Sequence, residues 1–163
     1  MWLVFDQGSK WWIIEHVMDL PRVIPVTSFF NLTLGWNRGV SFGMLSDLAL
    51  EPWMLAVPAL VVCGAFLIWV FRTHSWLISV GLGLLIGGAL GNAIDRLRRG
   101  AVTDFLDFHL ASWHWPAFNL ADVGVVCGVG LLVFESLFFA HRQQAELGSS
   151  SGGFPMRPQV SNE

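Results

Sequence analysis

Charged residues are scarce in this chain: 13% of its 163 residues are Asp, Glu, Lys or Arg, while 54% are hydrophobic. The formal net charge is −3 and no run of Lys or Arg exceeds two residues, which gives no reason to expect a nucleic-acid partner. A mean hydropathy of +0.58 is too apolar for a soluble domain of this length. Composition therefore favours a membrane protein, and the length favours a single domain.

Cysteine is nearly absent. The two cysteines, Cys63 and Cys127, each lie midway along an apolar run. Neither has the spacing of a metal site or a redox motif, and no disulfide framework is indicated. We interpret both as small apolar side chains within helices, so they carry no information about the compartment.

Several familiar catalytic motifs are also missing. The sequence has no HExxH zinc motif, no GxSxG motif and no Ser-Lys arrangement. His109 and His114, with Asp107, raise the question of a metal site, but a separation of five matches none of the usual helical zinc pairs. We interpret these histidines as interfacial side chains among Trp113 and Trp115, and we predict no bound metal.

Long apolar runs make up much of the chain. A membrane-spanning helix needs about 20 mostly apolar residues, and residues 53–71, 76–94 and 119–140 form three such runs. In residues 1–17 only five residues precede Asp6, which at 1.5 Å per residue gives roughly 7 Å of helix. We predict a mainly α, polytopic membrane protein: a four-transmembrane-helix bundle whose first helix is truncated at its N-terminus.

Glycine recurs at helical spacing in two of these runs. Gly83, Gly87 and Gly91 are four residues apart in one, and Gly124 and Gly128 are four apart in the last. Residues at this spacing lie along one helix face, and small residues there allow two backbones to approach closely. We predict that both faces pack against other helices.

The segment from residue 20 to residue 51 has the character of an extramembrane region. Pro and Gly punctuate it, and Val23–Thr33 is rich in β-branched and aromatic residues. We predict short strands that form a small sheet on the membrane surface, with a turn at Asn37–Gly39 and a return to the interface at Ser41–Leu45.

The chain becomes polar near its C-terminal end. A GSSSGG run followed by a Pro-containing stretch is typical of disorder. We therefore predict a membrane-embedded domain over residues 1–147 and a disordered polar tail over residues 148–163.

Polar side chains concentrate between Gly87 and Asp122, a stretch that begins inside one apolar run and ends as another begins. Polar groups bordering a bilayer are costly, so such a cluster is a functional-site candidate. The cluster contains four of the twelve acidic residues, three arginines and two asparagines: Asp95, Asp104, Asp107, Asp122, Arg96, Arg98, Arg99, Asn92 and Asn119.

Asp104 and Asp122 are the best candidates for chemistry. Both flank membrane helices, and an aromatic-rich loop separates them. Two carboxylates a few Å apart do not both ionise easily, so one keeps a proton near neutral pH. One carboxylate then serves as general base towards a water molecule while the other donates a proton. The sequence does not tell which of the two holds the proton.

Ion-paired helix caps are the alternative interpretation of such groups. For Asp95 with Arg96 that interpretation is the better one. Asp107 is interpreted as structural or solvated, and Asp6 and Lys10, which are four residues apart, as a helical ion pair.

Two other functions compete with catalysis. A small transporter or channel subunit would use the acids as an ion relay, but it would place them deep within the spans or show inverted repeats. Here the acids cluster at one end and no repeat is visible. A non-catalytic assembly factor would use the aspartates only as caps, and it would tolerate Asp104→Asn and Asp122→Asn.

The residues resemble the lipoprotein signal peptidase family, also called signal peptidase II. Five blocks carry the resemblance, and they occur in order from residue 5 to about residue 140. They are FDQGSK (Phe5–Lys10), FFNLTLGWNRGVSFGML (Phe29–Leu45), GGALGNAIDR (Gly87–Arg96), VTDFLDF (Val102–Phe108) and FNLAD (Phe118–Asp122).

The resemblance implies a four-helix aspartic endopeptidase that removes the signal peptide from diacylglyceryl-modified prolipoproteins by cutting before the lipidated cysteine. Asp104 and Asp122 match the family's catalytic aspartates. The substrate-binding or dyad-supporting positions would be Asn37, Arg38, Asn92, Asp95, Arg96, Asn119, Asp6 and Lys10. The segment from Leu20 to Glu51 would supply the family's small β-cradle, and the region from Asp104 to Pro116 its periplasmic helix-bearing loop.

The resemblance also implies partners and a location. The substrate would be a lipid-modified prolipoprotein among membrane lipids, and the peptide antibiotic globomycin would inhibit the enzyme. No metal or cofactor is implied. We expect a monomer. The enzyme would lie in the bacterial cytoplasmic (inner) membrane, with both termini in the cytoplasm and the site at the periplasmic or outer face. Basic residues are more frequent on the side of the polar cluster, which the positive-inside rule would place in the cytoplasm, so charge leaves the orientation open.

Overall fold

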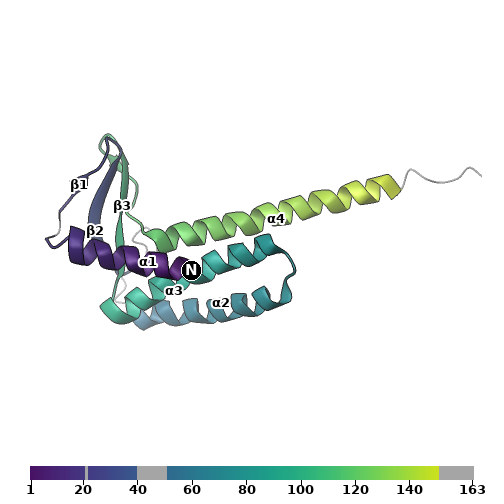
Figure 1. Cartoon of the computed structure of the whole chain (residues 1–163), viewed down its shortest axis with the longest axis horizontal. Coiled ribbons are helices and arrows are strands. Elements are labelled where there is room, and N and C mark those ends of the chain that lie inside the picture. The colour runs from purple at the N-terminus through teal and green to yellow at the C-terminus, as the bar shows by residue number, and fades with distance from the viewer. Residues whose placement is uncertain (21, 40–50, 151–163) are drawn as a thin grey trace, which may run out of the picture.

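The structure of the protein is a computed structural model that describes residues 1–20, 22–39 and 51–150, with side chains described as far as residue 137. Helices form one body, and a small sheet lies across one end of it (Figure 1). The elements in chain order are α1 (Trp2–Trp12), the π-helical turn η1 (Ile13–Val17), β1 (Ile24–Pro25), β2 (Phe30–Asn37), α2 (Pro52–Arg72), α3 (Trp76–Arg99), β3 (Val102–Leu110), β4 (Trp113–His114) and α4 (Leu120–Ser150).

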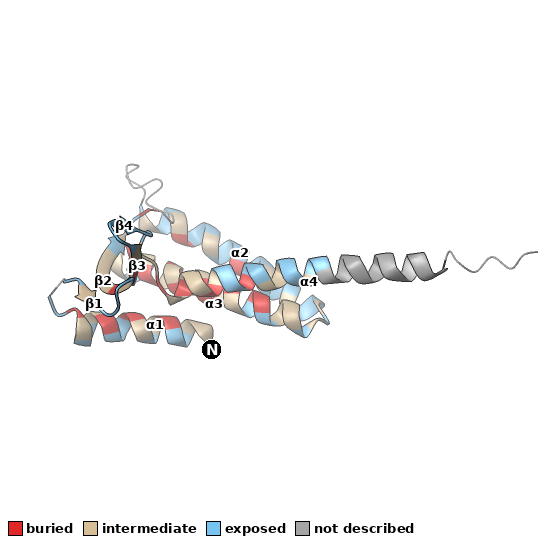
Figure 2. Cartoon of the chain, turned by 90° about the horizontal axis from the view of Figure 1, so that it is seen from above, coloured by how far each residue is buried: buried red, intermediate tan, exposed pale blue. Residues whose placement is uncertain are grey.

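Three helices are long and apolar enough to cross a membrane: α2, α3 and residues 120–137 of α4. The prediction of a polytopic helical protein is confirmed for these three spans. The predicted fourth span is not: α1 is an eleven-residue α-helix followed by the five residues of η1. α1 packs against α3 and α4 and lies along the half of the helical body nearest the sheet (Figures 1 and 2).

Local sequence signals explain where α3 begins and ends. The Ser75 hydroxyl caps its N-terminus by accepting a hydrogen bond from the backbone N–H of Ile78. Gly100 ends the helix in the left-handed conformation with φ 74°, which glycine adopts without steric cost. Because β3 begins only two residues later, this turn carries the chain from the helical body directly into the sheet.

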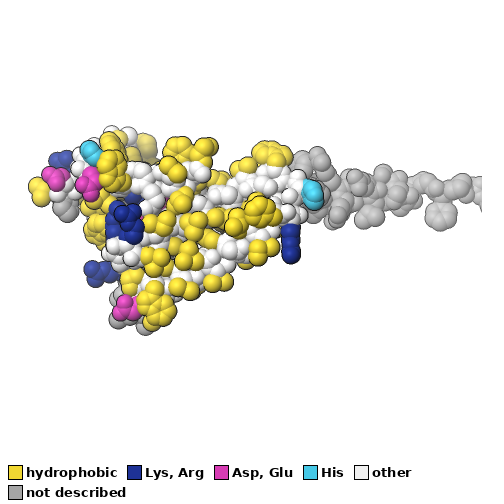
Figure 3. Space-filling model, turned by 60° about the horizontal axis from the view of Figure 1, so that its bottom comes forward, with side chains coloured by type: hydrophobic (Ala, Val, Ile, Leu, Met, Phe, Trp, Pro, Cys, Tyr) yellow, Lys and Arg dark blue, Asp and Glu magenta, His cyan; other side chains and the backbone are white. Residues whose placement is uncertain are grey.

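α3 is the most buried of the three spans, because it packs against both α2 and α4 (Figure 2). On the face drawn in Figure 3, hydrophobic side chains cover the helices, while charged side chains lie towards the two ends. A helical body with an apolar exterior fits a bilayer, in which the exposed side chains contact lipid.

Glycine contacts partly follow the predicted faces. Cβ atoms at Gly88 and Gly128 would meet the backbone of α4 and α3 respectively, and one at Gly124 would meet the indole of Trp2. Gly83 faces open space, so its predicted role in helix packing is wrong. Gly87 and Gly91 of the predicted face do pack closely against α1, whereas the face that contacts α4 carries Gly81 and Gly88.

The sheet has the order β1-β2-β3-β4 and is antiparallel throughout. β1 and β2 confirm the predicted strands within residues 20–51, and Asn37 does form a turn, since its Oδ1 accepts the Gly39 N–H at 3.0 Å. The predicted return at Ser41–Leu45 lies outside the described residues.

The second half of the sheet corrects an expectation. The region from Asp104 to Pro116 was expected to bear a helix, but most of it forms β3 and β4. β3 pairs with β2 from Phe30 opposite Phe108 to Asn37 opposite Val102, with an irregularity between Leu32 and Gly35. The cradle is therefore built from two segments that are distant in sequence.

The C-terminal helix also reaches further than the predicted domain boundary, because α4 runs to Ser150. Residues 151–163, most of the predicted disordered tail, lie outside the described residues, so the disorder of that tail stays a prediction.

The contrast between two glycines of α3 gives a test of the packing. Gly88→Ala should lower the free energy of unfolding by about 1–3 kcal/mol, because its methyl group would press on the Ala121 carbonyl. Gly83→Ala, the same exchange in the same helix, should be neutral or stabilising by up to about 1 kcal/mol. Thermal unfolding in detergent compares them, and equal effects would contradict this packing.

Candidate active site

The fold brings Asp104 and Asp122 to one pocket. Asp104 lies on β3 and Asp122 in the first turn of α4, and both line a cavity of about 400 Å³. Backbone hydrogen bonds between Leu106 and Phe118, at 2.8 and 3.0 Å, hold the approach to α4 against β3. This bridge explains how residues 18 apart in sequence meet at one site.

Asn119 joins the two aspartates directly. Its Nδ2 donates to Asp104 Oδ1 at 2.7 Å, while its backbone N–H donates to Asp122 Oδ2 at 3.2 Å. Its Oδ1 accepts the backbone N–H of Asp122 at 3.1 Å, which completes a reciprocal capping box at the start of α4. Asp122 is therefore both a capping residue and a pocket residue.

Two further asparagines complete the hydrogen bonds of the pair. Asn37 Nδ2 donates to Asp104 Oδ2 at 3.2 Å, and Asn92 Nδ2 donates to Asp122 Oδ1 at 2.9 Å. Each carboxyl group thus accepts one side-chain bond on one oxygen and another bond from Asn119 on the other. The predicted grouping of Asn37, Asn92 and Asn119 around the two aspartates agrees with these contacts.

The two carboxyl groups differ in exposure. Asp104 is 5% exposed, whereas Asp122 is only half-buried. Burial, together with the charge of Asp122, raises the pKa of Asp104 to about 6, against the opposing effect of its amide hydrogen bonds and of Lys10. An acid that keeps its proton up to about pH 6 beside a second carboxyl group is the arrangement that water-activating aspartate pairs need.

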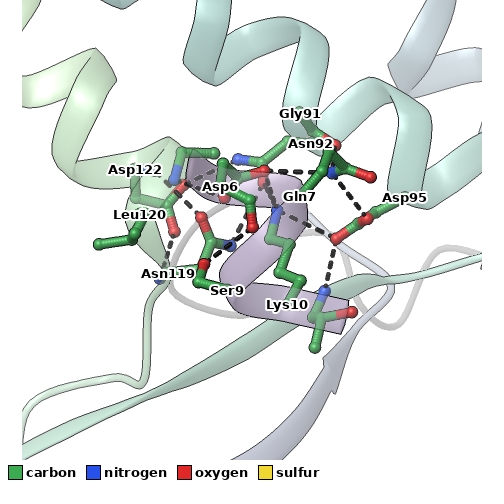
Figure 4. Close-up of polar contacts among 12 residues, drawn as sticks. Asp6, Gln7, Ser9, Lys10, Gly91, Asn92, Asp95, Asn119, Leu120 and Asp122 are labelled. Carbon is green, nitrogen blue, oxygen red and sulfur yellow. Dashed lines mark hydrogen bonds and ion pairs between the residues drawn. The ribbon is translucent and has the colours of Figure 1, made fainter. Parts of the chain in front are cut away.

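A buried ionic cluster lies beside Asp122 (Figure 4). Lys10, Asp6 and Asp95 are each fully buried, and the Lys10 ammonium lies 2.9 Å from Asp6 Oδ2 and 3.0 Å from Asp95 Oδ2. Its third hydrogen bond, at 3.1 Å, goes to Oδ1 of Asn92. The predicted pair of Asp6 and Lys10 is confirmed, and Asp95 and Asn92 extend it.

The cluster also fixes the backbone immediately before each aspartate of the pair. Asp95 Oδ2 accepts the N–H of Thr103 at 3.1 Å, and Asp6 Oδ1 accepts the N–H of Ala121 at 2.8 Å. Sequence reasoning missed these two backbone contacts. It also missed Gln7, whose amide donates to both Asp6 and Asp95 at 3.1 and 3.2 Å.

The predicted pairing of Asp95 with Arg96 is wrong. Asp95 pairs with Lys10 and with Arg99, whose Nη1 lies 3.0 Å from Asp95 Oδ1. Arg96 instead donates to the carbonyl of Gly39 at 2.8 Å. Its guanidinium interacts electrostatically with Asp122, Asp104 and, least strongly, Asp95, without forming an ion pair with Asp95. Arg96 therefore connects α3 with the end of β2 and supplies positive charge to the pair.

Two other predicted residues lie apart from the pair. Arg38 is exposed, and among the described residues none forms a hydrogen bond or ion pair with it. Asp107 accepts a hydrogen bond from Asn31 at 2.9 Å and lies 2.8 Å from His114 Nδ1. Although burial acts to raise it, these two contacts hold the pKa of Asp107 below its ordinary value. The structural interpretation of Asp107 is confirmed.

His109 and His114 stack on one another with ring centroids 4.9 Å apart. In the part of the chain that the structure describes, no group of three His, Cys, Asp or Glu side chains is arranged to hold a metal ion.

The walls of the pocket are mainly apolar. Residues 115–118 form one wall, and Val123, Val126 and Cys127 of α4 contribute to another. Sequence reasoning did not assign these residues, although the aromatic loop between the two aspartates was a signal for the first wall. A site with two carboxyl groups and apolar walls is suited to an apolar substrate that is cut by water.

Known proteins share both the sequence and the fold. A family model described as signal peptidase (SPase) II matches residues 1–138. Among curated relatives, the lipoprotein signal peptidase of Rhodopseudomonas palustris is 44% identical over 85% of this chain and 88% of its own length. That of Methylorubrum extorquens is 40% identical over 94% of this chain and 91% of its own length.

Two solved structures, each described as a bacterial membrane enzyme structure obtained by the in meso method, have a similar fold. One has a TM-score of 0.70 and 27% identity over 97% of this chain and 90% of its own. The other also has a TM-score of 0.70, with 30% identity over 83% of this chain and 87% of its own.

The raised pKa of Asp104 predicts a dependence of stability on pH. Between about pH 4 and pH 6 the folded protein binds a proton at Asp104 that the unfolded chain lacks. This proton binding stabilises the folded state at pH 4, and the stabilisation is lost as the pH rises through 6. A shift of about two units corresponds to about 3 kcal/mol. Relative to the parent, Asp104→Asn should therefore gain up to about that free energy of unfolding from pH 4 to pH 8.

Thermal unfolding in detergent across this pH range measures the difference. Asp107→Asn is the comparison on the same strand: because the pKa of Asp107 is lowered, its carboxylate takes up no proton on folding between pH 4 and pH 6. A difference between Asp104→Asn and the parent that stays constant from pH 4 to pH 8 would contradict the raised pKa of Asp104.

Proposed function

The chain belongs to the signal peptidase II family, and from this premise we propose that it removes the signal peptide from diacylglyceryl-modified prolipoproteins, cutting before the lipidated cysteine. The observation that carries the proposal is the meeting of Asp104 and Asp122 in one apolar-walled pocket. We assign these two residues as the catalytic dyad of an aspartic endopeptidase.

The proposed reaction needs one proton shared by the pair. The ionised carboxylate takes a proton from a water molecule, and the oxygen of that water attacks the carbonyl carbon of the scissile peptide bond. The neutral carboxylic acid donates a hydrogen bond to the carbonyl oxygen and stabilises the charge that develops on it. The C–N bond then breaks as the amine leaves with a proton from the dyad, and the pair returns to its singly protonated state.

The hydrogen bonds of the site support this assignment. Each oxygen of the two carboxyl groups accepts a hydrogen bond from one of three asparagines, so the pair is held in place before substrate binds. Because the pair is already in place, less free energy is needed to reorganise the site during the reaction. Asn37, Asn92 and Asn119 are therefore proposed to orient the dyad, and Arg96 to balance its charge.

The pocket walls suggest how the substrate binds. Acyl chains and a signal helix are apolar, and so are residues 115–118, Val123 and Val126. The site lies where the sheet meets the helical body, a position that corresponds to the membrane interface if the apolar helices span the bilayer (Figure 1). A lipid-modified peptide would reach the dyad there without leaving the bilayer.

Location, inhibition and assembly are also proposed. The chain is a bacterial multi-pass membrane protein; we propose the inner membrane, with the site at its outer face. A globomycin-type peptide is proposed to inhibit by occupying the pocket. A monomer would suffice, because one chain supplies both aspartates and the walls.

The assembly-factor alternative has one observation in its favour, since Asp122 does form a capping box. Capping does not account for Asp104, which lies in a strand and is almost fully buried beside a second carboxyl group. The ion-relay alternative is less suited to this fold, because both aspartates lie at the sheet end of the helices.

The decisive test follows cleavage of a diacylglyceryl-modified prolipoprotein by the purified protein in detergent. Asp104→Asn and Asp122→Asn should each lower the rate by about 10³-fold or more, because each removes one half of the acid-base pair. Asp107→Asn, a carboxyl group on the same strand outside the pocket, should retain activity. If either dyad variant is folded by thermal unfolding and cleaves at the parent's rate, the assignment is wrong.

The pocket wall gives a second prediction. Val126→Trp would fill part of the cavity and should raise the KM for the lipid-modified substrate by about tenfold, with a smaller change in kcat. Val133→Trp is the control, because Val133 is also exposed and lies two turns further along the same helix. Equal kinetics for the two variants would exclude this wall from substrate binding.

A further inference from the structure

Lys10 is a fully buried cation whose hydrogen-bonding capacity is used completely. An ammonium group has three donors, and the partners of Lys10 are Asp6, Asp95 and the side-chain oxygen of Asn92. The two carboxylates suffice to balance a buried charge. The third contact, to a neutral amide of the active site, calls for a separate explanation.

The Asn92 amide lies between Lys10 and Asp122 and forms a hydrogen bond with each (Figure 4). Its Oδ1 accepts from Lys10 Nζ at 3.1 Å and from Asn119 Nδ2 at 3.2 Å, so its Nδ2 is directed at Asp122 Oδ1, 2.9 Å away. A cation at the oxygen draws electron density from the amide nitrogen, and hydrogen bonds in such a chain strengthen one another. The N–H bond to Asp122 is therefore a better donor to a negative charge than an ordinary amide.

We propose that Lys10 is a positioning residue for the dyad: acting through Asn92, it holds Asp122 as the ionised carboxylate and leaves the shared proton on Asp104. The proposal rests on the dyad assigned above and adds a division of labour within it. Asp122 becomes the base that activates water, and Asp104 becomes the acid that faces the scissile carbonyl.

Three independent features favour the charge on Asp122. It lies in the first turn of α4, where the helix dipole stabilises an anion. It is half-buried, whereas Asp104 is 5% exposed on a strand. The Arg96 guanidinium also interacts more strongly with Asp122 than with Asp104. The pKa of Asp104, raised by burial and by the charge of Asp122, agrees with this order, although Lys10 and the two amide hydrogen bonds act to lower it.

The charged side chains at the dyad and directly behind it lie on two elements, α1 and α3. Lys10 and Arg96 interact electrostatically with the dyad. Asp6 and Asp95 pair with Lys10, and Arg99 pairs with Asp95. Among the described residues, these three cations and two anions leave one positive charge over. A dyad with a single proton carries one negative charge and makes the group neutral, which supports one ionised and one neutral carboxyl group.

The test removes the charge of Lys10 without leaving an unpaired carboxylate. Lys10→Met alone would leave Asp6 and Asp95 unbalanced, so it is combined with Asp6→Asn. The double variant should move the acid limb of the profile of kcat/KM against pH upwards by about one unit. The cause is that an ionised Asp122 loses its support, so a higher pH is needed to form it. The value of kcat near pH 6 should fall while KM changes less than twofold.

Asp6→Asn alone is the matched control, because it leaves the contact between Lys10 and Asn92 intact. Its acid limb should stay in place or move to lower pH, in the opposite direction. If the double variant does not fold, Asp6→Asn with Lys10→Gln replaces it; glutamine keeps a donor but no charge, and the upward shift is expected again.

Asn92→Ala tests the route. In that background, adding the Asp6→Asn and Lys10→Met pair should produce no further shift, as in a coupled double-mutant cycle. A further shift of the same size would show that Lys10 acts through space and would overturn the role of Asn92. An unchanged acid limb in the double variant, with only a lower unfolding temperature, would reduce Lys10 to a structural role.

These outcomes are separate from failure of the proposed function. If a folded Asp104→Asn or Asp122→Asn variant cleaves the prolipoprotein normally, the dyad itself is wrong. If both variants are inactive and the acid limb of the pH profile is unchanged when Lys10 is replaced, the dyad assignment is kept and only the positioning role of Lys10 is rejected.

Discussion

The burial of one ammonium group, that of Lys10, is the constraint on which the site depends. A buried charge that loses a partner is strongly destabilising, so α1 must lie where Asp6, Asp95 and Asn92 surround it. The two carboxylates that balance it also accept the backbone N–H groups of Thr103 and Ala121. These are the residues directly before Asp104 and Asp122. One ionic cluster thus sets the position of a strand and of a helix, and through them of both carboxyl groups.

That cluster exists only because three helices approach closely. A Cβ atom at Gly91 would meet the Asp6 carboxylate, and one at Gly88 would meet the backbone of Ala121. Glycine in the interior of a helix costs up to about 1 kcal/mol relative to alanine. Here the absence of side chains on α3 makes room for the charged side chain of α1 and for the first turn of α4. Packing and electrostatics therefore depend on each other at this point of the fold.

The parts of the fold that could be predicted are those governed by local pattern. Apolar runs gave three spans, a spacing of four gave the pair of Asp6 and Lys10, and two aspartates at helix ends gave the candidate dyad. The pairing of Asp95 with Arg96 was wrong because adjacent residues on a helix point about 100° apart. Asp95 faces the buried cluster, while Arg96 reaches a backbone carbonyl of a distant turn.

Strand β3 and the glycine contacts show where local pattern ends. The sequence of β3 is rich in β-branched and aromatic residues, which are typical of strands. The family resemblance favoured a helix-bearing loop there instead. For glycine, the spacing identifies candidate faces, but the neighbouring helix decides which one is used. Gly88 is buried against α4 and Gly83 is exposed, although both lie in the same helix.

The architecture itself gives the two carboxyl groups different surroundings. Asp104 accepts hydrogen bonds from two neutral amides, that of Asn37 in β2 and that of Asn119 directly before α4. The helical side presents to Asp122 the N-terminus of α4 and an amide backed by a buried cation. Both carboxyl groups accept similar numbers of hydrogen bonds. They differ in the charges that lie next to the groups that donate those bonds. In the proposed mechanism, acid and base follow from this difference: the strand contributes the proton and the helix contributes the charge.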